Sequence, residues 1–212
     1  MSIVMLCFLK LISVFFIVRG GKYFYMKKIL AFLCLASLTI CGTANAENDT
    51  KKNWELQLEY LKGNISSERR IDNYNVHLYQ KSHEHRALSF YRGFTFTRAT
   101  GYTDPRGMGI LRDGEGVGIG PSGMLRWDKN ISGKLYMNWD FAGSLMFYNK
   151  AHPYDGRAYG FLWRTGPSFT WKYKDEDSFT VGAYISHFSN GLKKHNPGYN
   201  TWGVCLGLNH QF

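Results

Sequence analysis

Apolar and polar residues alternate along most of the chain after residue 46. Successive side chains of an extended strand point to opposite faces, so alternation with period 2 predicts strands that have one apolar face. At the end of the chain, Trp202, Val204, Leu206 and Leu208 share such a face. Eight segments carry the pattern: 54–60, 74–78, 88–96, 117–127, 135–147, 161–171, 179–185 and 202–208. The sequence therefore predicts an all-β protein with eight antiparallel strands.

The connections between these segments alternate in length. Short connections fall at 81–86, 129–133 and 174–177, and longer ones at 63–71, 101–115, 149–158 and 191–199. Barrels of the bacterial outer membrane have short periplasmic turns, longer outer loops, an apolar face toward lipid and a polar interior. Residues opposite the apolar rows are indeed small or polar, as at Arg164, Gly166 and Ser168. The expected fold class is an eight-stranded antiparallel transmembrane β-barrel in the outer membrane.

Two further features agree with this class. No stretch of about 18 apolar residues follows residue 46, so the sequence offers no membrane-spanning helix there. The chain ends on Phe212 after an alternating strand, which is typical of the signal that the outer-membrane assembly machinery recognises, although His210 stands where an apolar residue is more usual. Because side chains fill an eight-stranded barrel, we expect no open pore.

The beginning of the chain has the pattern of an export signal. A positively charged region starts at Met26, residues 29–40 are apolar, and Ala46 ends a small-x-small pattern suited to signal peptidase. We therefore expect a signal peptide over residues 26–46 and the outer-membrane barrel over residues 47–212.

Residues 1–25 are expected to be an over-extended start, with Met26 as the true initiator. The alternative is a short membrane helix or a second export signal over Met1–Val18, which is apolar. Cys41 does not indicate a lipoprotein, because bulky Ile40 precedes it where lipidation requires a small residue.

Loss of the leader changes the charge and the cysteine content. The first 46 residues hold five basic and no acidic residues, so the net charge of +10 becomes +5. This mild basic bias suits anionic lipid and nucleic acid alike. Three of the four cysteines lie in the leader, so Cys205 has no partner for an intrachain disulfide.

Two motifs favour structural over chemical interpretations. The glycine-rich run at 114–120 lacks the Gly-Lys-Ser/Thr of a phosphate loop, and small interior residues of a strand explain it. His83, Glu84 and His85 could ligate a metal, but they fall in a predicted turn with no further ligand in view. We expect no metal site.

His187 and Ser189 interrupt an apolar row. They share the parity of Phe179, Val181 and Ile185, and polar residues on a lipid-facing row are functional candidates. The alternative is that the strand has already left the membrane. His187 stands about 26 Å beyond Phe179 along the strand, or roughly 19 Å in depth at 45° tilt, within an apolar band about 25 Å tall. The pair is therefore expected near the outer edge of the hydrocarbon.

The types of these residues suggest ester hydrolysis. A histidine two positions from a serine on one strand face can act as base toward that nucleophile. The Asn190 side chain and the Gly191 backbone N–H could stabilise the oxyanion. A third group must orient the histidine, and Asn200 on the next strand is the expected candidate.

These residues carry a family resemblance. The sequence HFSNG at 187–191, followed by NPG at 196–198 and the terminal alternating strand, resembles the lipid A 3-O-deacylase (PagL) family, grouped with the acyloxyacyl hydrolase-like outer-membrane barrels. The similarity is sharpest over residues 142–212 and architectural over residues 54–139.

The resemblance implies a carboxylic ester hydrolase that removes the ester-linked 3-hydroxyacyl chain from position 3 of lipid A. It implies that Ser189 is the nucleophile, His187 the general base, and Asn190 and Gly191 the oxyanion donors. Where the best-known member has a glutamate, this chain has Asn200, which can orient a histidine but stabilises an imidazolium less. No cofactor is needed.

The expected partners follow from this interpretation. They are lipid A of lipopolysaccharide in the outer leaflet and the outer-membrane assembly machinery; no nucleic acid is expected, and homodimer formation is left open. Lys193 and Lys194 either attract lipid A phosphates or stay solvated. The rival functions are a non-enzymatic barrel for adhesion or membrane integrity, an acyltransferase barrel and a phospholipase.

Overall fold

A computed structural model describes residues 52–63, 69–104, 109–190 and 197–212. Eight long strands and one two-residue strand make up the regular structure of these ranges. They are β1 (Asn53–Lys62), β2 (Arg69–His85), β3 (Leu88–Thr103), β4 (Arg112–Asp113), β5 (Gly116–Ser132), β6 (Leu135–His152), β7 (Arg157–Lys172), β8 (Asp177–Ser189) and β9 (Tyr199–Gln211). Within the described ranges, no helix is long and apolar enough to cross a membrane. The predicted signal peptide and start site lie outside them.

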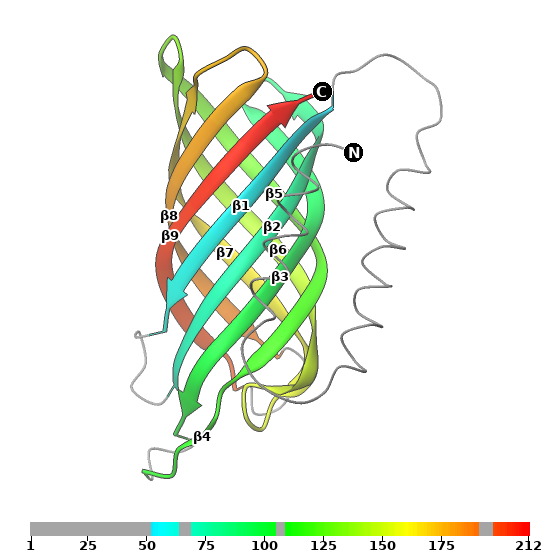
Figure 1. Cartoon of the computed structure of the whole chain (residues 1–212), viewed down its shortest axis with the longest axis vertical. Coiled ribbons are helices and arrows are strands. Elements are labelled where there is room, and N and C mark those ends of the chain that lie inside the picture. The colour runs from blue at the N-terminus through cyan, green and yellow to red at the C-terminus, as the bar shows by residue number, and fades with distance from the viewer. Residues whose placement is uncertain (1–51, 64–68, 105–108, 191–196) are drawn as a thin grey trace, which may run out of the picture. The chain divides into compact units, whose positions relative to one another are not determined.

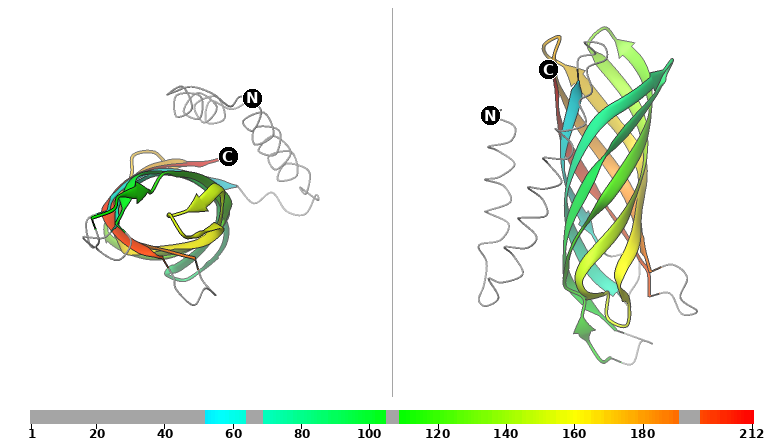
Figure 2. Two further views of the ribbon diagram at one scale, coloured as in Figure 1. Left: turned by 90° about the horizontal axis from the view of Figure 1, so that it is seen from below. Right: turned by 90° about the vertical axis from the view of Figure 1, so that its right-hand side faces the viewer.

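The eight long strands close into an antiparallel ring. The order is β2-β1-β9-β8-β7-β6-β5-β3, and β2 also pairs with β3. The first and last strands join directly, with Asn53 opposite Gln211 and Lys62 opposite Trp202. Figure 1 shows the tilted strands, and Figure 2 shows the closed ring from the end. This confirms the predicted eight-stranded antiparallel β-barrel.

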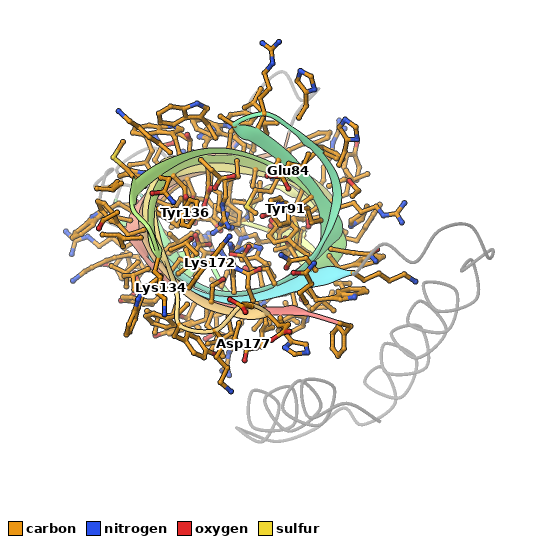
Figure 3. All side chains as sticks on the ribbon, turned by 90° about the horizontal axis from the view of Figure 1, so that it is seen from above. Glu84, Tyr91, Lys134, Tyr136, Lys172 and Asp177 are labelled. Atoms are coloured by element: carbon orange, nitrogen blue, oxygen red, sulfur yellow. The ribbon has the colours of Figure 1, made fainter. Side chains whose placement is uncertain are left out.

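The alternation in the sequence becomes a difference between the two faces of the barrel wall. Large apolar side chains are exposed on the outer face, among them Trp139, Phe141, Val204 and Leu208, which are 53–55% exposed. Side chains fill the interior (Figure 3), and many of them are polar. The exposed apolar band and the buried polar interior are the reverse of a soluble protein and are typical of a transmembrane barrel.

The buried charges of the interior are paired. The Arg126 guanidinium donates to Glu55 Oε2 at 2.8 Å and to Asp140 Oδ1 at 2.7 Å. Arg164 donates to Glu59 Oε1 at 2.7 Å. An unpaired charge in such a place would cost several kcal/mol, so these contacts allow the charged groups to be buried.

The two ends of the barrel differ, as the connection lengths predicted. The turns after β2, β5 and β7 lie at the end that holds the C-terminus, which we call the terminal end (Figure 1). Two of them are tight, with a positive φ at Arg86 and at Gly133. The opposite end, which we call the loop end, carries the connections after β1, β3, β6 and β8.

The third connection of the loop end differs from the prediction. The sequence predicted a loop over 149–158, but β6 continues to His152 and β7 resumes at Arg157, so a four-residue turn joins them. A register irregularity between Phe147 and His152 precedes this turn. The two strands extend beyond the segment in which apolar and polar residues alternate. Backbone pairing continues there, although the outer face no longer consists of apolar residues.

A buried cluster lies beneath this turn, which projects over the opening of the ring in the end-on view of Figure 2. His152 is 1% exposed, and its Nε2 lies 2.8 Å from the Tyr199 hydroxyl. Tyr199 donates to Asn73 Oδ1 at 3.0 Å and stacks on Phe188, with ring centroids 4.7 Å apart. The cluster joins β2, β6, β8 and β9, and therefore fixes the strand ends that carry the candidate site.

Candidate active site

The polar pair of the sequence lies on the accessible face of β8. Ser186 and Phe188 face the barrel interior and are buried. His187 and Ser189 are partly exposed, and they continue the outward-facing row of Val181, Ala183 and Ile185, which are exposed. His187 and Ser189 therefore project to the same side of the wall, two residues apart. This is the arrangement in which a base can reach a hydroxyl nucleophile.

Asn200 orients the histidine. It stands opposite His187 in the pairing of β8 with β9, and its Oδ1 lies 2.6 Å from His187 Nδ1. An amide oxygen accepts hydrogen bonds, so Nδ1 carries the proton in this contact and Nε2 keeps its lone pair. The imidazole is thus held in the tautomer that can accept a proton from a hydroxyl.

Neighbouring residues restrict the imidazole ring further. Trp163 lies opposite His187 on β7, with ring centroids 5.7 Å apart. On the other side, a Cβ at Gly198 would stand 3.3 Å from His187 Nε2 and 2.7 Å from the Phe188 carbonyl oxygen. Arg69 donates to the Gly198 carbonyl at 2.7 Å. Gly198 therefore allows the chain to pass close to the reactive edge of the ring.

Gly198 belongs to the NPG motif, but neither Gly198 nor Trp163 was predicted to lie beside the imidazole of His187. The alternation of outward and inward residues along β7 could have indicated Trp163, because this residue occupies the outer face of β7 opposite His187. No local pattern signals the approach of Gly198 to the ring, since that contact depends on how the chain enters β9.

The Asn190 side chain lies on the interior side of the barrel wall. Its side chain is buried, its Oδ1 accepts from the Arg157 backbone N–H, and its Nδ2 donates to the His152 carbonyl at 3.0 Å. The amide is thus directed to the β6–β7 turn, away from the face that carries Ser189. This direction follows from the inward parity that Asn190 shares with Phe188, and its role as an oxyanion donor stays a prediction. Gly191, Lys193 and Lys194 lie outside the described residues.

The fold and the exposed apolar band define a protein class. A closed ring of antiparallel strands, apolar outside and polar within, is a transmembrane β-barrel of the outer-membrane type. The sequence then identifies the family: residues 66–209 match the lipid A 3-O-deacylase (PagL) family, so the chain belongs to this family and to the outer membrane.

Three solved structures are similar to this chain to different degrees. The crystal structure of the outer membrane enzyme PagL matches with a TM-score of 0.50 and 10% identity, over 72% of this chain and 97% of that chain. Neisserial surface protein A matches with a TM-score of 0.47 and 8% identity, over 79% of this chain and 100% of that chain. The Yersinia pestis outer membrane protein Ail matches with a TM-score of 0.38 and 13% identity, over 77% and 100%. No curated protein sequence matches.

Proposed function

We propose that this chain hydrolyses the ester bond of the 3-hydroxyacyl chain at position 3 of lipid A, from the outer, lipid-facing wall of the barrel. One observation carries the mechanistic part of this proposal. His187 Nδ1 lies 2.6 Å from Asn200 Oδ1, on the strand face that also carries Ser189. Family membership supplies the substrate class.

The proposed reaction is a two-step acyl transfer. Nε2 of His187 takes the Ser189 hydroxyl proton while Oγ attacks the ester carbonyl, and a tetrahedral oxyanion forms. Its collapse breaks the bond to the sugar oxygen, which receives the proton from His187. Water, deprotonated by His187, then attacks the acyl-serine. Collapse of the second tetrahedral intermediate breaks the bond to Ser189 Oγ, which receives the proton back from His187, and the hydroxy fatty acid is released. Asn200 holds the ring throughout and stabilises the imidazolium less than a carboxylate would.

The location of the site suits a lipid substrate. His187 and Ser189 end an outer row that contains Val181, Ala183 and Ile185, so the site borders the apolar band at the loop end. Lipid A presents its ester bonds where hydrocarbon meets sugar, and it can reach this wall by lateral diffusion. The backbone N–H of Gly191 is the proposed oxyanion donor, and Lys193 and Lys194 are proposed to supply positive charge near the site.

Mass spectrometry of lipid A tests the proposal. Cells that express the full chain should show lipid A that has lost one hydroxyacyl mass, compared with cells that carry an empty vector. An added acyl mass would instead identify an acyltransferase. Unchanged lipid A with fatty acid released from phospholipid would identify a phospholipase, and unchanged lipids of both kinds would favour the non-enzymatic barrel.

Asn200 offers a graded test of the histidine contact. Asn200→Ala should lower the rate of lipid A hydrolysis by roughly 10²-fold, because the imidazole loses the acceptor that fixes its tautomer. Asn200→Asp should raise the rate above that of the unsubstituted protein, because a carboxylate stabilises the imidazolium better.

Initial rates of the purified proteins in detergent provide the measurement, and Asn200 is exposed, so both variants should fold. Mobility shifts on heating in gel electrophoresis check the fold. Full activity in Asn200→Ala would remove Asn200 from the mechanism.

A further inference from the structure

A second surface feature lies two strands from the catalytic residues. The loop-end portions of β1, β2 and β3 border a cleft of about 390 Å³. We call it the rim cleft; its lining includes Lys62, Gly63, Arg70, Asp72, Gly101 and Tyr102. At Gly63 a Cβ would stand 2.0 Å from the Ile71 carbonyl oxygen, so the close approach of the backbones excludes a side chain there.

The cleft offers positive charge. Lys62 and Arg70 are both exposed, and within the described part of the chain neither forms an ion pair with a carboxylate. The carboxylate of Asp72 is engaged by neutral donors, the Gly63 backbone N–H at 3.0 Å and the Tyr60 hydroxyl at 3.0 Å. The two cations therefore keep hydrogen-bond donors available to a ligand.

The cleft stands at the depth of lipid head groups. Tyr60 and Tyr74 lie next to it on the outer face, with ring centroids 5.2 Å apart, and tyrosines of this kind mark the membrane interface of barrels. Lys62 follows Tyr60 by one outward position on β1. Basic residues just beyond an aromatic girdle attract anionic head groups.

The cleft is also close to the catalytic residues. Lys62 stands opposite Trp202 on β9, which is two residues beyond Asn200. Neighbouring strands are about 5 Å apart and two residues of a strand span about 7 Å, so the Lys62 backbone is roughly 8 Å from that of Asn200. Both side chains lie on the outer face, within reach of one sugar-phosphate head group.

We infer that the rim cleft binds a phosphate monoester of the lipid A molecule whose ester bond is presented to Ser189. This inference rests on the proposed function. A guanidinium matches two phosphate oxygens at once and an ammonium adds a point charge, so Arg70 and Lys62 together suit a phosphate dianion. The cleft would then determine which end of the head group lies over the catalytic residues.

Equilibrium binding in detergent micelles tests the inference. Binding is measured in the Ser189→Ala background, which prevents turnover, with lipid A, with dephosphorylated lipid A and with inorganic phosphate as competitor. Lys62→Gln/Arg70→Gln should weaken lipid A binding about 30-fold and leave binding of dephosphorylated lipid A unchanged. Inorganic phosphate should compete only at concentrations far above those of lipid A.

A matched control is available at the terminal end, where Lys134 and Lys172 are labelled in Figure 3. Lys134→Gln/Lys172→Gln also removes two positive charges, at the other end of the barrel, and should leave lipid A binding unchanged. The inference is overturned by equal weakening in this control, by equal weakening toward dephosphorylated lipid A, or by no weakening at all. Displacement of lipid A by inorganic phosphate at matching concentration would overturn the assignment to a lipid.

Turnover separates this inference from the proposed function. If protein with Ser189 intact hydrolyses no lipid A while the binding pattern above holds, the proposed hydrolase function is wrong and the phosphate-binding role of the rim cleft is supported. If turnover is normal and the binding pattern is absent, the phosphate-binding role of the rim cleft is wrong and the hydrolase function is supported.

Discussion

Replacement of Ser189 by alanine is expected to lower lipid A hydrolysis by roughly 10⁴-fold or more. The substitution removes the oxygen that forms the acyl-enzyme, and residues of a nucleophile–base pair act as one unit. His187→Ala should therefore cost about as much, and the double variant little more than either single one. The measurements are initial rates with purified lipid A and mass spectra of lipid A from expressing cells.

Ser186 provides the matched control. It lies on the same strand, but its side chain is buried in the interior and its Oγ has no hydrogen-bond partner among the residues that the structure describes. Ser186→Ala should consequently keep both fold and activity. Retained hydrolysis in folded Ser189→Ala, or an equal loss in Ser186→Ala, would remove Ser189 from the role of nucleophile.

Replacement of Arg126 by methionine is expected to lower the free energy of unfolding by about 5 kcal/mol. Arg126 makes four hydrogen bonds to the carboxylates of Glu55 and Asp140, and all three side chains are at most 2% exposed. The variant leaves two buried carboxylates without their guanidinium, which costs more than the lost hydrogen bonds alone. Denaturant unfolding in lipid vesicles measures the effect.

Two variants isolate the cause. Arg126→Met combined with Glu55→Gln and Asp140→Asn should recover much of the lost stability, because no unpaired charge is left inside. Arg92→Met removes an exposed arginine of β3 and should change stability by less than about 1 kcal/mol. An Arg126→Met protein as stable as the unsubstituted one would show that the interior tolerates these carboxylates.

The strands were predictable because lipid imposes a strict alternation on the outer face. Where β2 and β6 continue beyond the apolar band, as at Arg69 and His152, the alternation stops and the strand ends could not be located. The partners of the interior charges could not be predicted either. Arg126 and Glu55 are 71 residues apart, and their contact depends on ring closure.

Parity and strand pairing were sufficient to predict that His187 contacts Asn200 and that Ser189 shares the strand face of His187. The same parity places the Asn190 side chain inside the barrel, whereas the motif suggested a catalytic amide. Its partners, the His152 carbonyl and the Arg157 N–H, are the strand residues on either side of the β6–β7 turn, in a segment predicted as a loop. The contact therefore had no signal in the sequence near position 190.

The barrel wall is one strand thick, so consecutive residues of β8 lie in different surroundings, one on the outer face and the next in the interior. Ser189 faces outward, while Asn190, directly after the strand, points inward and holds the β6–β7 turn. Alternate positions of this strand can consequently be varied as two separate sets. Engineering of substrate preference can use the odd-numbered positions other than 187 and 189, and engineering of rigidity can use the even-numbered ones, with little interference between them.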